Sequence, residues 1–498
     1  MLISTIGKII GFVREQVIAG YFGATQAVDA YVAAYSVPLF ILATVTSALY
    51  TSFIPVFMRW RSERGEREAW VLVGTLLKVT GIGLGALSAT AYIAAPLIVR
   101  LQAPDFSPEA ARLTVTLLRI IIPGTVFSGL ASIIVAILNA HHRFGWSALS
   151  PALLSAGTVV GAVALVPRYG LSGLAYASLF GMLLQFGALL WQIRARQFPI
   201  VWIGKLIHPG LKQLLLISGP IFVSTFFMQL YLFVNRWLAI GLEPGSLASL
   251  NYASKLVALP IGLFVSAMAT AIYPTLSELY SKSNEDGFRG TLASGFRMLL
   301  VVIVPAAVGL FVLREPIVRV AFQRGAFDSA ATARTSTALA YAAFGLIGQA
   351  CISLLNNAFY SRGDASTPVK VSMIFVVVNT TLSVILAKPL AVGGLALATT
   401  ISQFVSMVLL VATMARRHAI HFATASFTVK LAVSAAIMGA TAHQVYRMSR
   451  DSGLALPLVL SAIAGAIVYF ALVLLLRVGE LASICRLVKR KLRVNLVA

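Results

Sequence analysis

The sequence predicts an all-α, polytopic membrane protein with about fourteen transmembrane helices. Hydrophobic residues make up 59% of its 498 residues, and charged residues make up only 11%. A soluble globular protein carries roughly 25% charged residues, so this chain has too few to cover a surface that faces water. Its apolar runs are mostly about 20 residues long, the length that a helix needs to cross the hydrocarbon core of a bilayer.

The apolar runs are separated by short segments with turn residues or clustered charge, such as RWRSERGERE, HHRFG, PRYG and SRGDASTP. This punctuation and the run lengths predict helices in the following order. The candidate spans are residues 2–22, 28–57, 70–99, 111–140, 147–166, 171–193, 211–241, 247–279, 292–313, 331–360, 367–388, 392–415, 427–446 and 455–477.

The distribution of Lys and Arg predicts how these spans are oriented. An even number of spans places both termini on one side, and the loops of that side hold roughly twice as many basic residues as the other loops. They include Arg59, Arg61, Arg64, Arg67, Arg194, Arg196, Arg416, Arg417 and the cations of the tail 479–498. We therefore expect both termini in the cytoplasm and the protein in the bacterial cytoplasmic membrane. The net charge of +23 follows from these loops, so nucleic acid is not an expected partner.

Two pairs of segments suggest an internal duplication. LNAHHRFGWSALSP (138–151) aligns with LNNAFYSRGDASTP (355–368). GLAYAS (173–178) aligns with GLALAT (394–399), and the shift along the chain is nearly the same for both pairs. A repeat of six helices implies two parallel halves, an architecture of transporters whose substrate site lies where the halves meet.

The duplication predicts four parts of the chain. They are an N-terminal six-helix lobe (1–196), a C-terminal six-helix lobe (207–418), an aliphatic helix pair (425–478) and a basic cytoplasmic tail (479–498). The helix pair carries no polar constellation, so it is expected either to contact lipid or only to pack against the second lobe.

Several ionised residues fall inside predicted spans, where each costs about 2.5–3.5 kcal/mol on insertion scales. The candidates for a functional role among them are Lys8, Arg14, Glu15, Asp29, Arg236 and Lys255. Arg14 could simply pair with Glu15 or Asp29 and hold the helices together. The cations nevertheless outnumber the nearby acids, which predicts a cationic cavity for an anionic substrate. Arg in particular favours bidentate contacts with phosphate.

No motif for covalent chemistry or ATP hydrolysis occurs in the sequence. It lacks a GxxxxGK[ST] loop, a Cys/His metal cluster and a Ser/His/Asp array, and its two cysteines lie far apart. We therefore expect a transporter rather than an enzyme, without a cofactor or a metal, driven by a gradient, the membrane potential or the flux of its substrate.

The segments GKIIGFVREQVIAGYFGATQAVDAYVAAYSVP, LNYASKLVALPIGLF and NAFYSRGDASTPVK resemble the MurJ (MviN) family of lipid II flippases. That family belongs to the multidrug/oligosaccharidyl-lipid/polysaccharide flippase superfamily. The resemblance covers the first twelve spans in order. It implies transport of lipid II, an undecaprenyl-pyrophosphate glycolipid of peptidoglycan synthesis, by a monomeric protein surrounded by membrane lipids.

By motif position the resemblance implies roles for single residues. Arg14, Lys8 and Lys255 match arginines of the family's cationic cavity, and Asp29 matches a motif aspartate. Glu15 stands where the family has aspartate; we expect it to orient Arg14, and Asp29 to fasten the junction of the first two helices. The helix pair 425–478 matches the groove assigned to the polyprenyl tail.

The departures from the family pattern leave two features open. Leu42–Ala43 replace an expected cation, for which Arg236 is a candidate substitute. The family's proposed sodium site matches four neutral residues here, Asn235, Asn379, Ser383 and Thr399. A monovalent cation is therefore expected to bind weakly if at all. Export of another polyprenyl-pyrophosphate oligosaccharide, such as O-antigen or capsule units, and cation-coupled drug export remain the alternatives.

Overall fold

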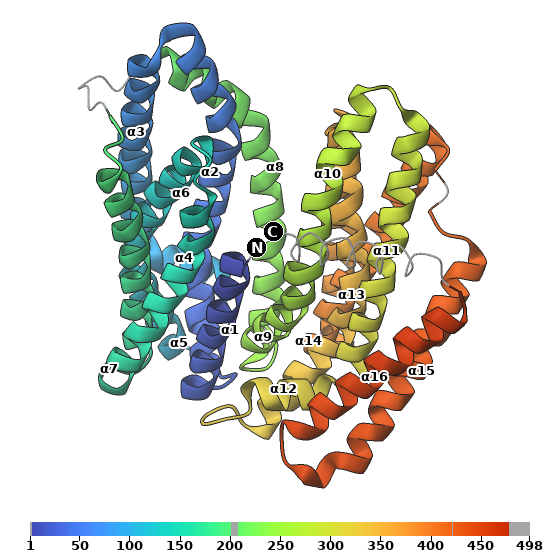
Figure 1. Ribbon diagram of the computed structural model, residues 1–498. Coiled ribbons are helices and arrows are strands. Elements are labelled where there is room, and N and C mark those ends of the chain that lie inside the picture. Colours follow the sequence, from blue (N-terminus) through green and yellow to red (C-terminus); the bar gives the residue numbers. More distant parts are fainter. Residues whose placement is uncertain (1, 201–207, 421, 478–498) are drawn as a thin grey trace. The chain divides into compact units, whose positions relative to one another are not determined.

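The computed structural model describes residues 2–200, 208–420 and 422–477. All regular structure in these three ranges is helical, which confirms the predicted all-α class (Figure 1). The helices group into two compact units, which are described separately. The first comprises residues 1–248 and 324–327, and the second comprises residues 249–323 and 328–498.

The first unit contains eight helices and the start of a ninth. They are α1 (Leu2–Phe22), α2 (Gln26–Arg64), α3 (Glu66–Ile93), α4 (Ala95–Gln102), α5 (Pro108–Ile121), α6 (Gly124–Ala140), α7 (Phe144–Ala195), α8 (Pro209–Ile240) and the first turn of α9 (Ser246–Pro260). One core cluster lies mainly among α2, α3 and α6, where Trp70 packs edge-on against Phe57 and stacks with His141.

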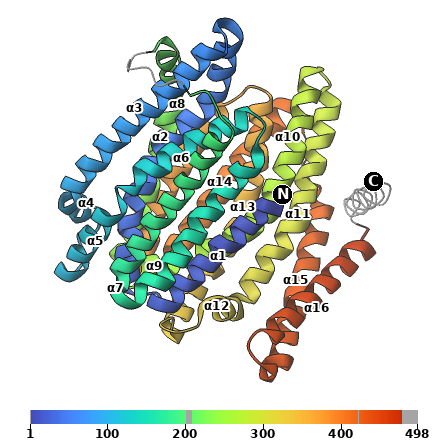
Figure 2. The same ribbon diagram turned by 60° about the vertical axis from the view of Figure 1, so that its left-hand side comes forward.

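The second unit continues from α9 through a short π-helical turn. Its further elements are η1 (Ile261–Val265), α10 (Ser266–Ser281), α11 (Glu285–Val312), α12 (Arg314–Phe322), α13 (Ser329–Ser361), α14 (Ser366–His418), α15 (Ala425–Ser449), η2 (Arg450–Ser452) and α16 (Leu456–Leu475). In Figure 2, α15 and α16 lie side by side along α11.

Nine helices of the described residues are long and apolar enough to cross a membrane, and a tenth span results if α5 and α6 count as one helix bent by 43°. This agrees with a multi-pass membrane protein. Two of these helices, α7 and α14, have 52 and 53 residues, and each is interrupted by a non-helical residue, Gly170 or Ala391. The interruptions fall between the predicted spans 147–166 and 171–193 and between 367–388 and 392–415.

The alignment of GLAYAS with GLALAT extends to backbone features of both units. Continued toward the N-terminus without a gap, it pairs Gly170 with Ala391, whose φ/ψ angles are 54°/−134° and 46°/−129°. The break of the long helix therefore recurs three residues before the aligned segments GLAYAS and GLALAT.

The compact units divide the chain at a different place from the predicted lobes. The predicted border lies at residues 196–207, of which 201–207 are outside the described residues, as is the predicted tail 479–498. Helix α8 packs against α2, and Ser218 Oγ donates a hydrogen bond to Ser52 Oγ at 3.0 Å. Because of this packing, α8 belongs to the first unit, although the duplication counts it as the first helix of the second lobe.

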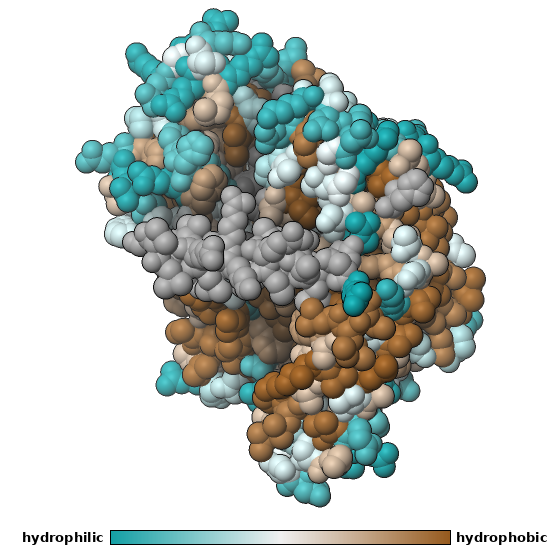
Figure 3. All heavy atoms as spheres, turned by 45° about the vertical axis from the view of Figure 1, so that its right-hand side comes forward, coloured by the Kyte–Doolittle hydropathy of each residue, from teal (hydrophilic) through white to brown (hydrophobic). Residues whose placement is uncertain are grey.

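The α15–α16 pair is attached to α11 by one apolar cluster. The hydroxyl of Tyr469 on α16 donates to the carbonyl oxygen of Val301 on α11 at 2.8 Å, and Leu431 and Met438 of α15 pack at the same place. The outer side of the pair is apolar and exposed, with Ile467 64% accessible. Figure 3 shows this face as a broad hydrophobic surface, consistent with contact to lipid chains.

Replacing Gly173 by alanine should lower the melting temperature of the purified protein. The new methyl group would lie 2.5 Å from the carbonyl oxygen of Leu165 across the break of α7, so the backbone must shift. Overpacking of this kind costs about 1–3 kcal/mol. Gly187→Ala in the same helix is the control, because no atom lies within 4 Å of its new methyl group. Equal melting temperatures of the two variants would contradict the close approach.

Candidate functional site

Arg14 and Glu15 form a buried ion pair on α1. The Nη2 of Arg14 donates to Glu15 Oε1 at 2.7 Å, and the two side chains are 19% and 6% exposed. The Nε–H of Arg14 is also buried, and it has no hydrogen-bond acceptor among the described residues. The guanidinium is therefore held by one acid while a further donor is left for another group.

Two tyrosines of α2 lie close enough to interact with the charge of Arg14. The rings of Tyr31 and Tyr35 stack with centroids 5.8 Å apart. The hydroxyl of Tyr31 shares a 2.8 Å hydrogen bond with Ser178 Oγ of α7. The pair on α1 is thus surrounded by groups that have a polar end on an apolar body, which suits an ionised group within a membrane.

The other predicted cations occupy three helices. Lys8 lies on α1, Arg236 on α8 and Lys255 on α9, and all three are half-buried. Lys8 and Arg236 belong to the first unit and Lys255 to the second. Arg14 is not an unpaired cation, because Glu15, its neighbour in the chain, pairs with it.

Asp29 has another role than the one the sequence suggested. Its carboxylate is 2% exposed and accepts hydrogen bonds from the backbone N–H of Gly245 at 2.6 Å and of Ala248 at 2.7 Å. These donors lie at the N-terminus of α9, where N–H groups lack partners within the helix and a negative charge is favoured. Asp29 of α2 therefore caps α9, a helix far along the chain, which is a contact that the sequence did not predict.

Three of the four neutral positions assigned to a cation site are connected by hydrogen bonds. Asn379 Nδ2 donates to Thr399 Oγ1, and Ser383 Oγ donates to Asn379 Oδ1, both at 3.2 Å. Asn379 and Ser383 are completely buried in α14. The fourth position, Asn235, lies in the first unit and donates to the carbonyl oxygen of Tyr231 at 3.4 Å. The three residues of α14 join the two segments of that helix on either side of its interruption.

A polar cluster that the sequence did not assign lies at one end of the second unit. Arg362, after α13, makes two 2.9 Å contacts with the carboxylate of Glu285 at the start of α11. Its guanidinium also lies 5.0 Å from the ring centroids of both Tyr280 and Phe288. A bidentate pair between two aromatic rings fixes the α13–α14 turn against the α10–α11 turn.

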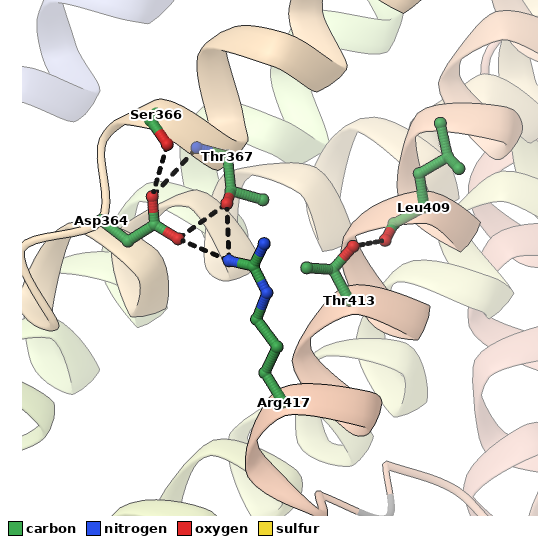
Figure 4. Close-up of polar contacts among 6 residues, drawn as sticks. All are labelled: Asp364, Ser366, Thr367, Leu409, Thr413 and Arg417. Carbon is green, nitrogen blue, oxygen red and sulfur yellow. Dashed lines mark hydrogen bonds and ion pairs between the residues drawn. The ribbon is translucent and has the colours of Figure 1, made fainter.

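Asp364 caps the following helix, as Figure 4 shows. It accepts the backbone N–H of Thr367 at 3.0 Å and the Thr367 hydroxyl at 2.7 Å, and Arg417 from the end of α14 donates to it at 3.2 Å. Burial alone would raise the pKa of Asp364. The hydrogen bonds of Thr367 and Ser366 and the charge of Arg417 outweigh this, so its pKa lies below the ordinary 3.8.

The segment NAFYSRGDASTPVK contains the motif FY-x-R-x-D-x-x-TP, which therefore has a structural explanation that its spacing did not reveal. Its arginine and its aspartate each fasten a different helix end. An aspartate shortly before an apolar helical run is an N-cap signal that sequence reasoning could have used. The partners Glu285 and Arg417 lie 77 and 53 residues away, and no local pattern points to them.

Asp29→Asn should destabilise the first unit. The asparagine keeps one acceptor oxygen but loses the charge, and hydrogen bonds to a charged group contribute about 1.5–3 kcal/mol. We expect a melting temperature lower by several degrees. Asp451→Asn is the matched control because Asp451 is exposed. If both variants have the melting temperature of the parent protein, Asp29 does not stabilise α9.

The contribution of Asp364 to stability should depend on pH. Its pKa is lowered by folding, so the ionised form stabilises the folded state above the ordinary pKa of 3.8. That contribution is lost as the pH falls through the lower pKa of the folded protein. Melting curves between pH 7 and pH 3 should show a deficit for Asp364→Asn that shrinks at acid pH. A deficit that is constant with pH would mean that the charge is unimportant.

Known proteins resemble this chain over nearly its whole length. Residues 18–470 match the sequence profile of the family described as lipid II flippase MurJ. The lipid II flippase MurJ of Burkholderia cenocepacia is 27% identical, covering 83% of this chain and 82% of that protein. The probable lipid II flippase MurJ of Vibrio cholerae is 30% identical, covering 89% and 87%.

Solved structures agree with the same fold. A structure of lipid II flippase MurJ in an inward closed conformation superposes with a TM-score of 0.84 at 24% identity, covering 96% of this chain and 98% of that one. An inward-facing multidrug transporter of the MATE family superposes with a TM-score of 0.74 at 16% identity, covering 83% and 94%. The profile match spans most of the sequence, and the chain belongs to the lipid II flippase MurJ family, whose members are transporters and not enzymes.

Proposed function

We propose that this protein moves lipid II, or a closely related polyprenyl-pyrophosphate glycolipid, from the inner to the outer leaflet of the bacterial cytoplasmic membrane. The observation that carries the proposal is a buried arginine in a chain that belongs to a flippase family. Arg14 pairs with one carboxylate only, and its Nε–H lacks an acceptor among the described residues. A pyrophosphate is an anion that supplies such acceptors.

The cations of both units have the same proposed role. Arg14, Lys8 and Arg236 of the first unit and Lys255 of the second would contact the pyrophosphate or the sugar–peptide head group during alternating access. Glu15 would hold the guanidinium of Arg14 until the substrate competes for it. Arg offers a planar fork and Lys a point charge, so Arg14 is assigned the oriented contact and Lys8 and Lys255 the less directional ones.

The proposed topology has fourteen spans and two parallel six-helix repeats followed by α15 and α16, with both termini in the cytoplasm. The breaks at Gly170 and Ala391 support this count, because each divides an over-long helix into two segments of membrane-spanning length. The recurrence of these breaks at the same distance before GLAYAS and GLALAT supports the repeat. We assign the polyprenyl tail to the apolar α15–α16 pair.

Ion coupling is proposed to be weak. The oxygen atoms of Asn379, Ser383 and Thr399 are neutral, and they are engaged in hydrogen bonds with one another or with the backbone. Hard monovalent cations prefer oxygen ligands, but a site without a carboxylate has little charge to attract them. The membrane potential, which supplies about 2.3 kcal/mol per charge per 100 mV, is the alternative source of energy.

Another glycan is the second candidate substrate. Leu42–Ala43 occupy a place where the family pattern has cations, and Lys8 and Lys255 stand where it has arginine. Fewer bidentate contacts would suit a head group with different acidic substituents. Binding of purified lipid II compared with O-antigen and capsule precursors distinguishes the two candidates.

Arg14→Ala should abolish growth rescue of a strain depleted of its lipid II flippase, because the oriented phosphate contact is lost. Lys255→Ala should do the same, and Arg14→Lys should rescue only partly. The measurement is colony formation on depletion, with the amount of protein in the membrane fraction followed by immunoblot. Arg59→Ala is the control, since the Arg59 side chain is 59% exposed and pairs with Glu63 at a helix end. Full rescue by both alanine variants would remove the cation assignment.

A further inference from the structure

A cavity lined by three arginines lies between α4 and α5, apart from the residues discussed so far. Its volume is about 550 Å³, within the range of sites that hold small molecules. Arg100 comes from α4 and Arg112 and Arg119 from α5, and the remaining lining is mainly apolar, including Val99, Phe106 and Val115. Cations at the wall of a largely apolar cavity fit an amphiphilic anion.

The two cations of α5 form one stripe with Thr116. Residues 112, 116 and 119 have the spacing i, i+4, i+7, which places them on one face over a distance of about 10 Å. The Nε of Arg112 donates to the carbonyl oxygen of Pro108 at 3.2 Å, and the Nε of Arg119 donates to that of Tyr92 at 3.3 Å. Both contacts use Nε, so they hold the guanidinium while the terminal nitrogens remain available to a ligand.

None of the three arginines pairs with a carboxylate in the part of the chain that the structure describes. The acids nearest in sequence are Asp105 and Glu109, and neither lines the cavity. The carboxylate of Asp105 is directed to the end of α8, where its Oδ2 would lie 3.0 Å from a methyl group on Gly241. The positive charge of the cavity is thus not neutralised locally.

The position of the cavity along α3 makes the cations unusual. Helix α3 separates the basic α2–α3 turn from α4 and α5, and Figure 2 shows the latter two at the opposite end of α3. The basic turn is the proposed cytoplasmic side, so the cavity lies toward the outer leaflet. The positive-inside bias also disfavours arginine close to the outer ends of membrane spans, which indicates that these three serve a purpose other than orientation.

An exposed apolar stripe adjoins the cavity on α4. Ile93, the last residue of α3, and Leu97 and Leu101 of α4 are spaced four residues apart and are 76%, 59% and 64% exposed. They lie beside the stripe of Pro96 and Arg100, both of which line the cavity. The helix is fixed from its other side by Gln102, whose Nε2 donates to Ser36 Oγ of α2 at 2.6 Å. A ligand with a phosphate and acyl chains could use both stripes together.

We propose that this cavity binds the phosphate head group of an anionic glycerophospholipid of the outer leaflet, with its acyl chains along Ile93, Leu97 and Leu101. The three guanidinium groups supply charge-assisted hydrogen bonds to the phosphate oxygens, and the exposed stripe supplies the apolar contact. The site is independent of the transport cations, because its residues lie on other helices than Lys8, Arg14, Arg236 and Lys255.

The test measures binding of fluorescent phosphatidylglycerol to the full-length protein in a neutral detergent, with phosphatidylcholine as the zwitterionic comparison. The variant is R100Q/R112Q/R119Q. The control is R59Q/R61Q/R64Q, which removes equal charge from the end of α2. The parent protein and the control should prefer phosphatidylglycerol, and the cavity variant should bind it about tenfold more weakly or worse. Unchanged affinity of the cavity variant, or no preference in the parent protein, would overturn the proposal.

Two further arms separate a lipid from a free anion. Leu97→Gln with Leu101→Gln should weaken binding of phosphatidylglycerol while the arginines are intact; unchanged binding would argue against a lipid occupant. Inorganic phosphate should compete only weakly with the lipid. If phosphate at millimolar concentration displaces it fully, the cavity is a free-anion site and the lipid assignment fails. Circular dichroism verifies that each variant is folded.

Discussion

The free-energy cost of an ionised group within a membrane is the constraint on which the arrangement of this protein depends. Such a group costs about 2.5–3.5 kcal/mol on insertion scales and more without partners. The first unit buries two carboxylates, and each is satisfied differently. Glu15 pairs with the adjacent Arg14, whereas Asp29 receives two backbone N–H groups at the start of α9. Glu15 therefore pairs with a cation, and Asp29 stabilises the start of a helix.

Charged residues at the helix ends of the second unit also need partners, but there they connect helix ends. Asp364 stabilises the N-terminus of α14 and Arg362 fastens the turn before it, each by charge-assisted hydrogen bonds. These residues lie outside the spans, where burial is partial and water is near. Their role is to fix the ends of long helices, which supports assigning the substrate contacts to the cations of α1, α8 and α9 instead.

The arginines of the first unit form two chemically distinct groups. Arg14 is neutralised by an acid and surrounded by Tyr31 and Tyr35 within the helix bundle. Arg100, Arg112 and Arg119 lack a carboxylate partner among the described residues and adjoin an exposed apolar stripe. The fold is shared with drug transporters, so the fold alone does not determine what either group of arginines binds. Function in such folds depends on the side chains of the individual sites.

Sequence by itself determined the all-α class, the approximate place of the long helices and the family, whereas the short helix α12 lies between two predicted spans. It did so because membrane-spanning length and hydrophobicity are local properties, and because motifs such as FY-x-R-x-D-x-x-TP lie in one stretch of chain. Only the tertiary structure decided the partners: Asp29 with Gly245, Arg362 with Glu285, and α8 with the first unit. A carboxylate is satisfied by whichever donors the fold brings near, and donors 77 or 216 residues away leave no trace in local spacing.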